Sequence, residues 1–381
     1  MQRVVARARP GHPWVFSNEV VDPPVSALPV GGTVDVYDPR GRALGVGYAN
    51  PRSLIAIRLV GVGADIDGAA LYRERIASAL AWRGRVMPGR GSLRLVAGEA
   101  DGLPGLIVDR YADVLSVQVT TLGMERRLDL VRPAVEELCG ARAAWLRNDV
   151  GVRTLEGLDA EPRAWFGEVP VPVAFEENGL RLLADIKSGQ KTGHFFDQAD
   201  NRAFMTGLAR GARVLDVFAH TGAWAVGALV GGAVEAVVVD SSASALALAR
   251  RNAELNGVRL ESREGDARAV MESMDARTFD IVCLDPPSFA KSRKGAAKAL
   301  GAYRQVNTAA ARLVRTGGLL FTSSCSHHVL AERFEEAVRH GVRAAGRSAL
   351  MIRRGGQSPD HPVLPSMPES EYLKHLVLVV H

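Results

Sequence analysis

From about residue 198 onward, short apolar runs with strand character alternate with stretches of helical period, notably Ser244–Leu255. The runs are apolar throughout rather than alternating, which is typical of strands buried on both faces of a parallel sheet. This part of the chain is therefore predicted to be a doubly wound α/β domain, whose ligands bind where the strands end. The expected strands are Arg213–Val217, Ala236–Asp240, Ile281–Asp285 and Leu319–Ser323.

The residues before this domain have a different character. The chain has 381 residues, more than one hydrophobic core usually holds, so several domains are expected. Residues 1–70 contain short β-rich runs divided by turn signals and predict a small β domain. Residues 71–170 combine helical periods over Leu71–Arg83 and Met124–Leu138 with a hairpin, which predicts a central α+β domain. The third domain is expected over residues 171–381, opening with another hairpin.

Composition narrows the class of protein. No run approaches the roughly 18 consecutive apolar residues of a membrane span, and the start of the sequence lacks the apolar stretch of a signal peptide. The three cysteines, Cys139, Cys283 and Cys325, are too few and too scattered for a disulfide framework or a zinc cluster. We therefore expect a protein of the reducing cytoplasm, without a membrane partner and without a metal.

Positive charge is concentrated in one segment. The formal net charge is +5, and between Pro286 and Ala331 there are seven basic residues and no acidic one. This segment is rich in glycine and alanine and is expected to be loop-like. A solvated surface would explain the charges, but so would contacts with nucleic-acid phosphates. Of these basic residues, the ones closest to the end of the expected fourth strand are Lys291, Arg293, Lys294 and Lys298.

Aspartates mark the ends of successive strands. Asp216 and Asp240 end the first two, Asp266 follows Gly265 where a third would end, and Asp285 ends the fourth. Each could be a helix N-cap by itself. Together, without a GxGxxG or GxxxxGK[ST] motif, they indicate an adenosine ligand that lacks a phosphate chain. A carboxylate at the end of the second strand suits ribose hydroxyls, and S-adenosylmethionine (SAM) fits such a site.

The fourth strand ends in Asp285-Pro286-Pro287, and with this motif the sequence resembles the class I SAM-dependent methyltransferases that act on nucleic-acid bases or amide nitrogens. Two prolines make the loop rigid and remove backbone donors. The carbonyl oxygens of Pro286 and Pro287 are then expected to accept hydrogen bonds from the exocyclic amine of a planar substrate. This motif does not fix which atom is methylated.

The end of the fifth strand carries a cysteine in a polar context, Ser324-Cys325-Ser326-His327-His328. Such surroundings favour the reactive thiolate, whereas we expect Cys139 and Cys283 to be buried and structural. Carbon 5 of a pyrimidine is too weak a nucleophile to take a methyl group until a thiolate adds to carbon 6. Cys325 therefore predicts carbon methylation of a pyrimidine.

Nearly the whole chain is similar to the bacterial large-subunit ribosomal RNA cytosine-5 methyltransferases of the RlmI-like type. The resemblance implies an N-terminal PUA-like RNA-binding domain, a central α+β domain and a Rossmann-like methyltransferase domain. It also implies that Gln198 contacts the methionyl part of SAM, and that the cofactor site includes Asp216, Thr221, Gly222, Asp240, Asp266 and Asp285. The motifs that carry it are His12-Pro13-Trp14-Val15-Phe16, residues 185–193, Asp197-Gln198-Ala199-Asp200-Asn201-Arg202, residues 285–291, residues 324–328 and residues 360–365.

The sequence departs from the family pattern in two places. His220 and Ala223 stand in the first turn, where relatives commonly have a Tyr-Thr-Gly-Gly type of sequence. Ser288 stands where many RNA cytosine-5 methyltransferases carry a second cysteine, so a second thiol cannot release the product. Asp285, or a water that it holds, is the expected base for the carbon-5 proton, ahead of His327 and His328.

The sequence hypothesis is thus a SAM-dependent methyltransferase that modifies a cytosine of 23S rRNA, either naked or in an assembling large-subunit particle. Cys325 and Asp285 are the expected catalytic residues, and the target base is expected to be turned out of its stack. Relatives make a homodimer conceivable. The alternatives are a guanine N-methyltransferase, a uridine C5 methyltransferase, and a SAM-binding ribosome-assembly factor without activity.

Overall fold

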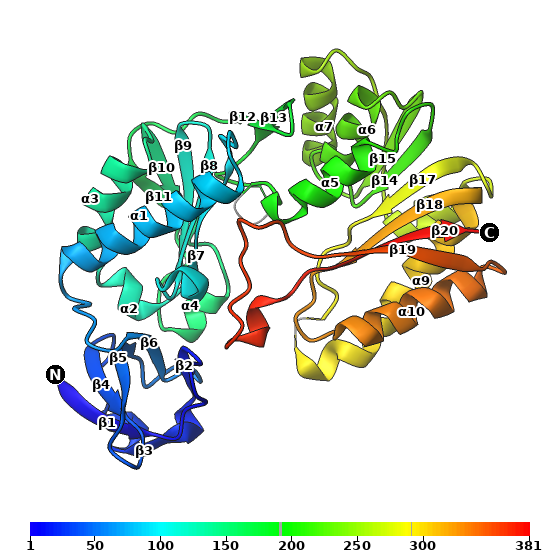
Figure 1. The fold of residues 1–381 in the computed structure, drawn as a ribbon. Coiled ribbons are helices and arrows are strands. Elements are labelled where there is room, and N and C mark those ends of the chain that lie inside the picture. The colour runs from blue at the N-terminus through cyan, green and yellow to red at the C-terminus, as the bar shows by residue number, and fades with distance from the viewer. Residues whose placement is uncertain (190–192, 291) are drawn as a thin grey trace. The chain divides into compact units, whose positions relative to one another are not determined.

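A computed structural model describes residues 1–189, 193–290 and 292–381 (Figure 1). The chain forms two compact units, each built from several segments. One unit comprises Met1–Val173, Asp185–His194 and Pro359–Ser370, and the other comprises Ala174–Ala184, Phe195–Ser358 and Glu371–His381.

The first unit begins with a six-stranded sheet in the order β2-β6-β5-β4-β1-β3. Inward and outward residues alternate along β4, and Val34 and Val36 pack with Val4 and Ile57 into a small core. This is the β domain that the period-two pattern predicts. The strands are β1 (Gln2–Ala6), β2 (Trp14–Val15), β3 (Val20–Asp22), β4 (Thr33–Tyr37), β5 (Ala43–Ala49) and β6 (Ile57–Gly61).

A second sheet in the same unit has the order β11-β10-β9-β8-β7 and packs with helices α1 (Ala69–Val86) and α3 (Leu128–Leu138) into one core. The helix expected over Met124–Leu138 is broken into α2 (Leu122–Glu125) and α3, with Arg127 between them. The Arg127 side chain is buried and donates hydrogen bonds to the carbonyls of Gly31 and Ile66, so its tertiary contacts override the local helical period. The remaining elements are β7 (Leu93–Ala97), β8 (Leu106–Tyr111), β9 (Val114–Val119), β10 (Ala143–Leu146), α4 (Val152–Leu155) and β11 (Arg163–Phe166).

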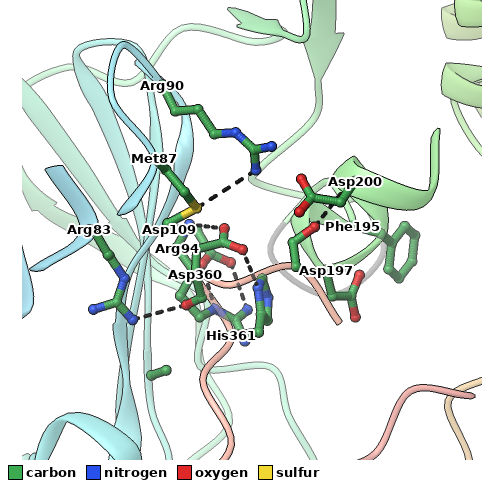
Figure 2. A network of polar contacts seen from close by, with 12 residues as sticks. Arg83, Met87, Arg90, Arg94, Asp109, Phe195, Asp197, Asp200, Asp360 and His361 are labelled. Carbon is green, nitrogen blue, oxygen red and sulfur yellow. Dashed lines mark hydrogen bonds and ion pairs between the residues drawn. The ribbon is translucent and has the colours of Figure 1, made fainter. Parts of the chain in front are cut away.

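Hydrogen bonds from Arg83 and Arg94 hold the segment Pro359–Ser370, which is distant in sequence, within this unit. The Asp360 carbonyl accepts a hydrogen bond from the buried Arg83 side chain at 2.9 Å, and its carboxylate accepts one from the Arg94 amide at 2.9 Å (Figure 2). The Arg94 guanidinium is paired in turn with the buried carboxylate of Asp109. The motif at residues 360–365 therefore has a structural role in the first unit.

The second unit contains a seven-stranded sheet in the order β16-β15-β14-β17-β18-β20-β19 (Figure 1). The first five of these strands are parallel, whereas β20 runs antiparallel to both β18 and β19. The predicted doubly wound sheet is therefore present, extended by an antiparallel pair that the sequence analysis did not anticipate. The strands are β14 (Arg213–Val217), β15 (Glu235–Asp240), β16 (Glu261–Glu264), β17 (Phe279–Leu284), β18 (Val314–Ser324), β19 (Ala349–Gly355) and β20 (Lys374–Val380).

Alternate residues of the central strands enter two different cores. Leu215 and Val217 of β14 pack with residues of α8, α9 and α10, whereas Val214 packs with residues of α5, α6 and α7. Burial on both faces explains why these strands are apolar throughout. The helices are α5 (Ala199–Thr206), α6 (Ala223–Val230), α7 (Ala243–Leu255), α8 (Ala267–Ser273), α9 (Ala296–Leu313) and α10 (Ala331–Ala344), and a hairpin of β12 (Val173–Glu177) and β13 (Leu180–Ala184) precedes them.

The expectation of a loop-like basic segment is wrong over most of its length. Residues 296–313 form the 18-residue helix α9, and β18 follows it directly. Alanine has the highest helix propensity of all residues, so the many alanines of this segment favour a helix rather than a loop. Among the described residues, no helix has the length and hydropathy of a bilayer span, and no group of three or more His, Cys, Asp or Glu side chains is arranged to hold a metal ion.

Candidate active site

The parallel register brings the predicted residues to one edge of the sheet. Asp216 lies beside Cys283 on β17, and Leu284, the last residue of β17, lies beside Thr322 on β18. Asp285 and Cys325 therefore follow adjacent strands at the same edge, with Asp240 ending the strand on the other side of β14. Parallel strands end together, so residues distant in sequence meet here.

The turn between β14 and α6 has an unusual backbone. Phe218, His220 and Gly222 have φ angles of 62°, 48° and 75°, a region that only glycine adopts without strain. The Asp240 carboxylate accepts a hydrogen bond from the His220 amide at 2.8 Å and fixes the turn. Thr221 is buried, and its carbonyl accepts a hydrogen bond from Asn252 at 3.0 Å. Strained backbone held by its surroundings is common at ligand sites.

Asp216 is fully buried behind this turn. One carboxylate oxygen accepts a hydrogen bond from the Ala225 amide in the first turn of α6, and the other has no hydrogen-bond partner among the described residues. Burial, together with the negative charges of Asp285 and Asp240, raises the pKa of Asp216 to about 8. An unpartnered buried carboxylate oxygen suits a ligand with a donor or a positive charge. SAM, with its amino group and sulfonium, fits this description.

Asp285 is held in one orientation by side chains of the same unit. Gln198 donates a hydrogen bond to it at 2.8 Å, and the Trp224 indole N–H lies 3.4 Å from its other oxygen. Burial raises the pKa of Asp285 to about 6, helped by the charge of Asp197. A carboxyl with this pKa exchanges protons near neutral pH, which general acid–base chemistry requires.

Gln198 is 2% exposed, and its amide group bonds to neighbouring side chains. The amide nitrogen donates to Asp285 and, at 3.0 Å, to the Ser323 hydroxyl, while the amide oxygen accepts from Asn201. Both amide hydrogens are thus directed at protein acceptors. In this structure Gln198 orients Asp285, and its expected contact with the methionyl part of SAM stays a prediction.

Asp266 is the exposed N-cap of α8, and its carboxylate accepts a hydrogen bond from the Ala269 amide at 2.9 Å. The contact is that of a helix cap, the structural alternative considered for each strand-end aspartate. An adenine contact through the same side chain remains a prediction.

Cys325 follows the last residue of β18 and is half-buried. Its thiol lies 3.9 Å from the Pro286 carbonyl oxygen, to which it donates a weak hydrogen bond. The structure therefore brings together the expected nucleophile and a carbonyl expected to accept from the substrate amine. Pro286 is buried, whereas Pro287 is exposed.

A network of hydroxyl groups holds the segment around Cys325. The buried Tyr303 hydroxyl of α9 lies 2.9 Å from the Ser324 hydroxyl and 2.8 Å from that of Ser326. Ser288 joins the network through Ser326 at 3.0 Å. The residue that replaces the second cysteine thus supports the segment that carries the first.

The other cysteines and the two histidines differ from Cys325 in their surroundings. Burial raises the pKa of Cys139 to about 11 and places the pKa of Cys283 well above its ordinary value, so both thiols stay protonated at neutral pH. His327 and His328 are exposed, and the His327 ring packs against Tyr372.

Of the expected phosphate contacts, Lys294 and Lys298 are exposed, the second in the first turn of α9. Lys291, the side chain of Arg293, and residues 190–192 of the family motif lie outside the described residues.

Sequence reasoning missed two residues of β20. Lys374 donates hydrogen bonds of 2.7 Å to the carbonyls of Ser326 and Tyr372. His375 is buried, stacks on Trp224 and lies 2.8 Å from the Ser323 hydroxyl. Burial lowers the pKa of His375 to about 3, so it is neutral. Both residues directly precede an apolar run, but nothing in the sequence shows that this strand lies beside β18.

Comparison with known proteins agrees with this geometry. Residues 94–363 match the family model of S-adenosylmethionine-dependent methyltransferases, and residues 1–61 match that of PUA-like domains. The protein named ribosomal RNA large subunit methyltransferase I from Alteromonas mediterranea is 38% identical over 378 residues, covering 97% of this chain and 95% of its own. Its namesake from Aeromonas salmonicida is 37% identical over 380 residues, with 96% and 95% covered.

The chain belongs to the ribosomal RNA large subunit methyltransferase I family. The expected fold class and the use of SAM are thereby confirmed. Two solved structures share the fold over 100% of both chains at 20% identity. One is a SAM-dependent methyltransferase from Streptococcus mutans, with a TM-score of 0.83, and the other is a methyltransferase complexed with S-adenosylhomocysteine, with a TM-score of 0.85.

Proposed function

We propose that this family member methylates carbon 5 of a cytosine in 23S rRNA through a covalent adduct with Cys325. The observation that carries the proposal is the 3.9 Å contact between the Cys325 thiol and the Pro286 carbonyl, beside Asp285. A nucleophile, an acceptor for an exocyclic amine and a carboxyl with a pKa of about 6 thus meet at one edge of the sheet. The names of the relatives support rRNA as the substrate. An rRNA substrate in turn supports a cytoplasmic enzyme.

The cofactor site fits the strand-end carboxylates. Asp216 offers an unpartnered buried oxygen to a cationic group, and Asp240 stands where ribose hydroxyls bind in doubly wound sheets. Thr221 and Gly222 form the turn, and we assign the adenine contact to Asp266. When bound, SAM supplies a methyl group on a sulfonium sulfur, which an activated carbon 5 can accept.

The residues of this chain supply the activation. The Cys325 thiolate forms a bond to carbon 6, and the electron pair of the C5=C6 double bond shifts through carbon 4 toward N3. Asp285, in its protonated form, donates a proton to N3, while the Pro286 carbonyl accepts a hydrogen bond from the exocyclic amine. After methylation Asp285 takes back the N3 proton. Asp285 passes that proton to solvent, and loss of the carbon-5 proton, to the Asp285 carboxylate or a water it holds, then re-forms the C5=C6 bond and expels the thiolate.

Binding of the polynucleotide is assigned to the basic residues after Pro287 and to the PUA-like domain. Lys294 and Lys298 are exposed at the start of α9, and with Lys291 and Arg293 they would contact phosphates. Such contacts orient the RNA without reading its sequence, so specificity is expected from loop contacts and RNA shape. The substrate is 23S rRNA, naked or in an assembling particle.

The first test is nucleoside mass spectrometry of 23S rRNA, naked and in unmodified large-subunit particles, after incubation with SAM labelled in its methyl group. We expect label in 5-methylcytidine. Label in 5-methyluridine or a methylguanosine would refute the base assignment, and no label on either substrate would favour an assembly factor. Replacing Cys325 by Ala should reduce methylation by at least about a thousandfold, and Cys139→Ala is the matched control.

The adduct can be tested directly with a 23S rRNA transcript containing 5-fluorocytidine. Fluorine at carbon 5 cannot leave as a cation, so the enzyme should remain bound to the RNA through Cys325 after methyl transfer. We expect a denaturation-resistant complex with the wild-type protein and none with Cys325→Ala. A guanine N-methyltransferase, for which the Asp-Pro-Pro motif alone suffices, would form no such complex and would not need Cys325.

A further inference from the structure

Lys374 lies next to the proposed nucleophile because of the antiparallel register between β18 and β20. Ser324, the last residue of β18, pairs with Lys374, the first residue of β20. Cys325 directly follows Ser324. A residue about fifty positions later in the sequence is thereby placed against the nucleophile segment.

The ammonium group of Lys374 is held in place by two backbone carbonyls. It donates a hydrogen bond of 2.7 Å to the Ser326 carbonyl and another of 2.7 Å to the Tyr372 carbonyl. Lysine has three N–H donors, so one remains after these two contacts. The positive charge is fixed beside the residue that follows Cys325, on a side chain that is half-buried.

The charges around Lys374 indicate what it does. Burial lowers the pKa of Lys374 to about 8, while negative charge on Cys325 and on Glu371 raises it. Coupling between two groups is reciprocal, so the ammonium favours the thiolate by the same interaction energy. Among the described residues, other titratable groups near this segment include Tyr303, whose pKa is raised, and Asp285. They also include His327, Tyr372 and Asp197, which contact one another in that order.

We propose that Lys374 is a positioning residue that holds the Cys325 segment and stabilises the Cys325 thiolate through its fixed positive charge. The inference rests on the proposed function, in which Cys325 is the nucleophile. It assigns to β20 a part in activating that thiol. Lys374 acts on the sulfur, and no contact with the substrate is assigned to it.

The test is the pH dependence of Cys325 alkylation by iodoacetamide in the full-length protein, without RNA or SAM, followed by peptide mass spectrometry. Only the thiolate reacts, so the midpoint of the profile reports the thiol pKa. We expect a wild-type midpoint below the ordinary value of about 8.5. In Lys374→Met it should rise by about one unit, which slows alkylation at pH 7 about tenfold.

Two control variants distinguish an effect of the positive charge of Lys374 from an effect on folding. Lys374→Arg should restore most of the wild-type profile, because it keeps the charge. Arg339→Met removes one exposed positive charge from α10 and should leave the profile unchanged. Cys139 and Cys283 are buried and should stay unreactive in every variant that is folded.

Two results would overturn the inference. One is a folded Lys374→Met protein with the wild-type midpoint, and the other is a wild-type midpoint at or above the ordinary thiol value, which decides the question even if the variant fails to fold. Alkylation requires neither RNA nor SAM, so the two proposals can fail separately. A shifted midpoint without 5-methylcytidine would refute the proposed function alone, whereas 5-methylcytidine with an unshifted midpoint would refute only the role of Lys374.

Discussion

Asp216 is a carboxyl that the folded protein holds without a full set of partners. Burial raises its pKa from 3.8 to about 8, so the folded state favours the protonated form. The stability that this carboxyl contributes is present below about pH 4 and is lost as the pH rises through about 8. A buried carboxyl without a full set of partners lowers the stability of the protein without ligand, but it can serve a cationic ligand.

Replacing Asp216 by Asn should therefore stabilise the protein without SAM, and more so at high pH. The amide oxygen of Asn can still accept from Ala225, and no charge is buried. Between pH 5 and pH 8.5, the difference in unfolding free energy between variant and wild type should grow by roughly 4 kcal/mol in favour of the variant. Urea unfolding measures this, and calorimetry should show weaker SAM binding.

A variant at Glu335 should show the opposite dependence of stability on pH. The hydrogen bond from Arg354 lowers the pKa of Glu335 on α10, so this carboxylate contributes stability above its unfolded pKa that is lost at low pH. Glu335→Gln should therefore be less stable than wild type at neutral pH, with the difference closing as the pH falls. A pH-independent difference for Asp216→Asn would mean that Asp216 is not held protonated.

The sequence predicts which kinds of side chain stand at the strand ends, but not which residues they contact. Asp216, Asp240 and Asp285 each directly follow an apolar run, and Cys325 comes shortly after another; parallel strands bring such residues together. The orientation of Gln198 depends on Ser323 and Asn201, which the fold brings to it. No local pattern encodes that arrangement.

At the scale of elements, the turn between β14 and α6 combines strain with close packing. Gly222 has a φ of 75°, and a Cβ added there would lie 2.9 Å from the Cβ of Ala249 on α7. Gly211 has a similar φ of 72°, but a Cβ there would meet nothing within 4 Å. The two glycines separate the cost of the backbone conformation from the cost of the clash.

Gly211→Ala should lower the unfolding free energy by about 1 kcal/mol, the usual cost of a left-handed alanine. Gly222→Ala should lower it by roughly 2–4 kcal/mol, because α7 must also move away from the turn. Thermal unfolding of the two variants measures the difference. Equal losses would show that α7 gives way freely, and the turn would then not be tightly held.

The elements themselves were predictable where packing agrees with local preference. β14 has the bounds that its apolar run predicts, and α7 differs from its prediction by one residue. Prediction fails where tertiary contacts oppose the local preference, or where a neighbouring strand determines the position of an element. Arg127 breaks a regular helical period to reach distant carbonyls, and β20 becomes a central strand because β18 and β19 lie on either side of it.

At the scale of the whole molecule, the excess of positive charge bears on the proposed binding of a polynucleotide. The chain carries 47 lysines and arginines against 42 aspartates and glutamates, and Lys294 and Lys298 stand exposed where the proposed active site continues into α9. Each phosphate contact releases counterions from RNA, so the affinity falls with salt in proportion to the number of contacts.

The double variant Lys294→Gln, Lys298→Gln should bind 23S rRNA more weakly and with less dependence on salt. The slope of log affinity against log salt concentration should be smaller by about 2 in magnitude, because two contacts are lost. Filter binding over a salt series measures it. Arg339→Gln with Arg343→Gln removes the same charge from exposed positions of α10 and should change the slope less. Equal changes would assign binding to net charge rather than to these lysines.

The strand order β17-β18-β20-β19 also has a consequence for the time at which the enzyme becomes active. β18 and β19 are synthesised before β20, the strand that lies between them, so a nascent chain that stops short of residue 374 leaves one edge of β18 open. Such a chain already contains the strand-end aspartates and Cys325, but neither Lys374 nor His375. We therefore expect translation of β20 to close the sheet and to complete the surroundings of the thiol in the same step, so that the reactivity proposed for Cys325 is acquired only as this domain finishes folding.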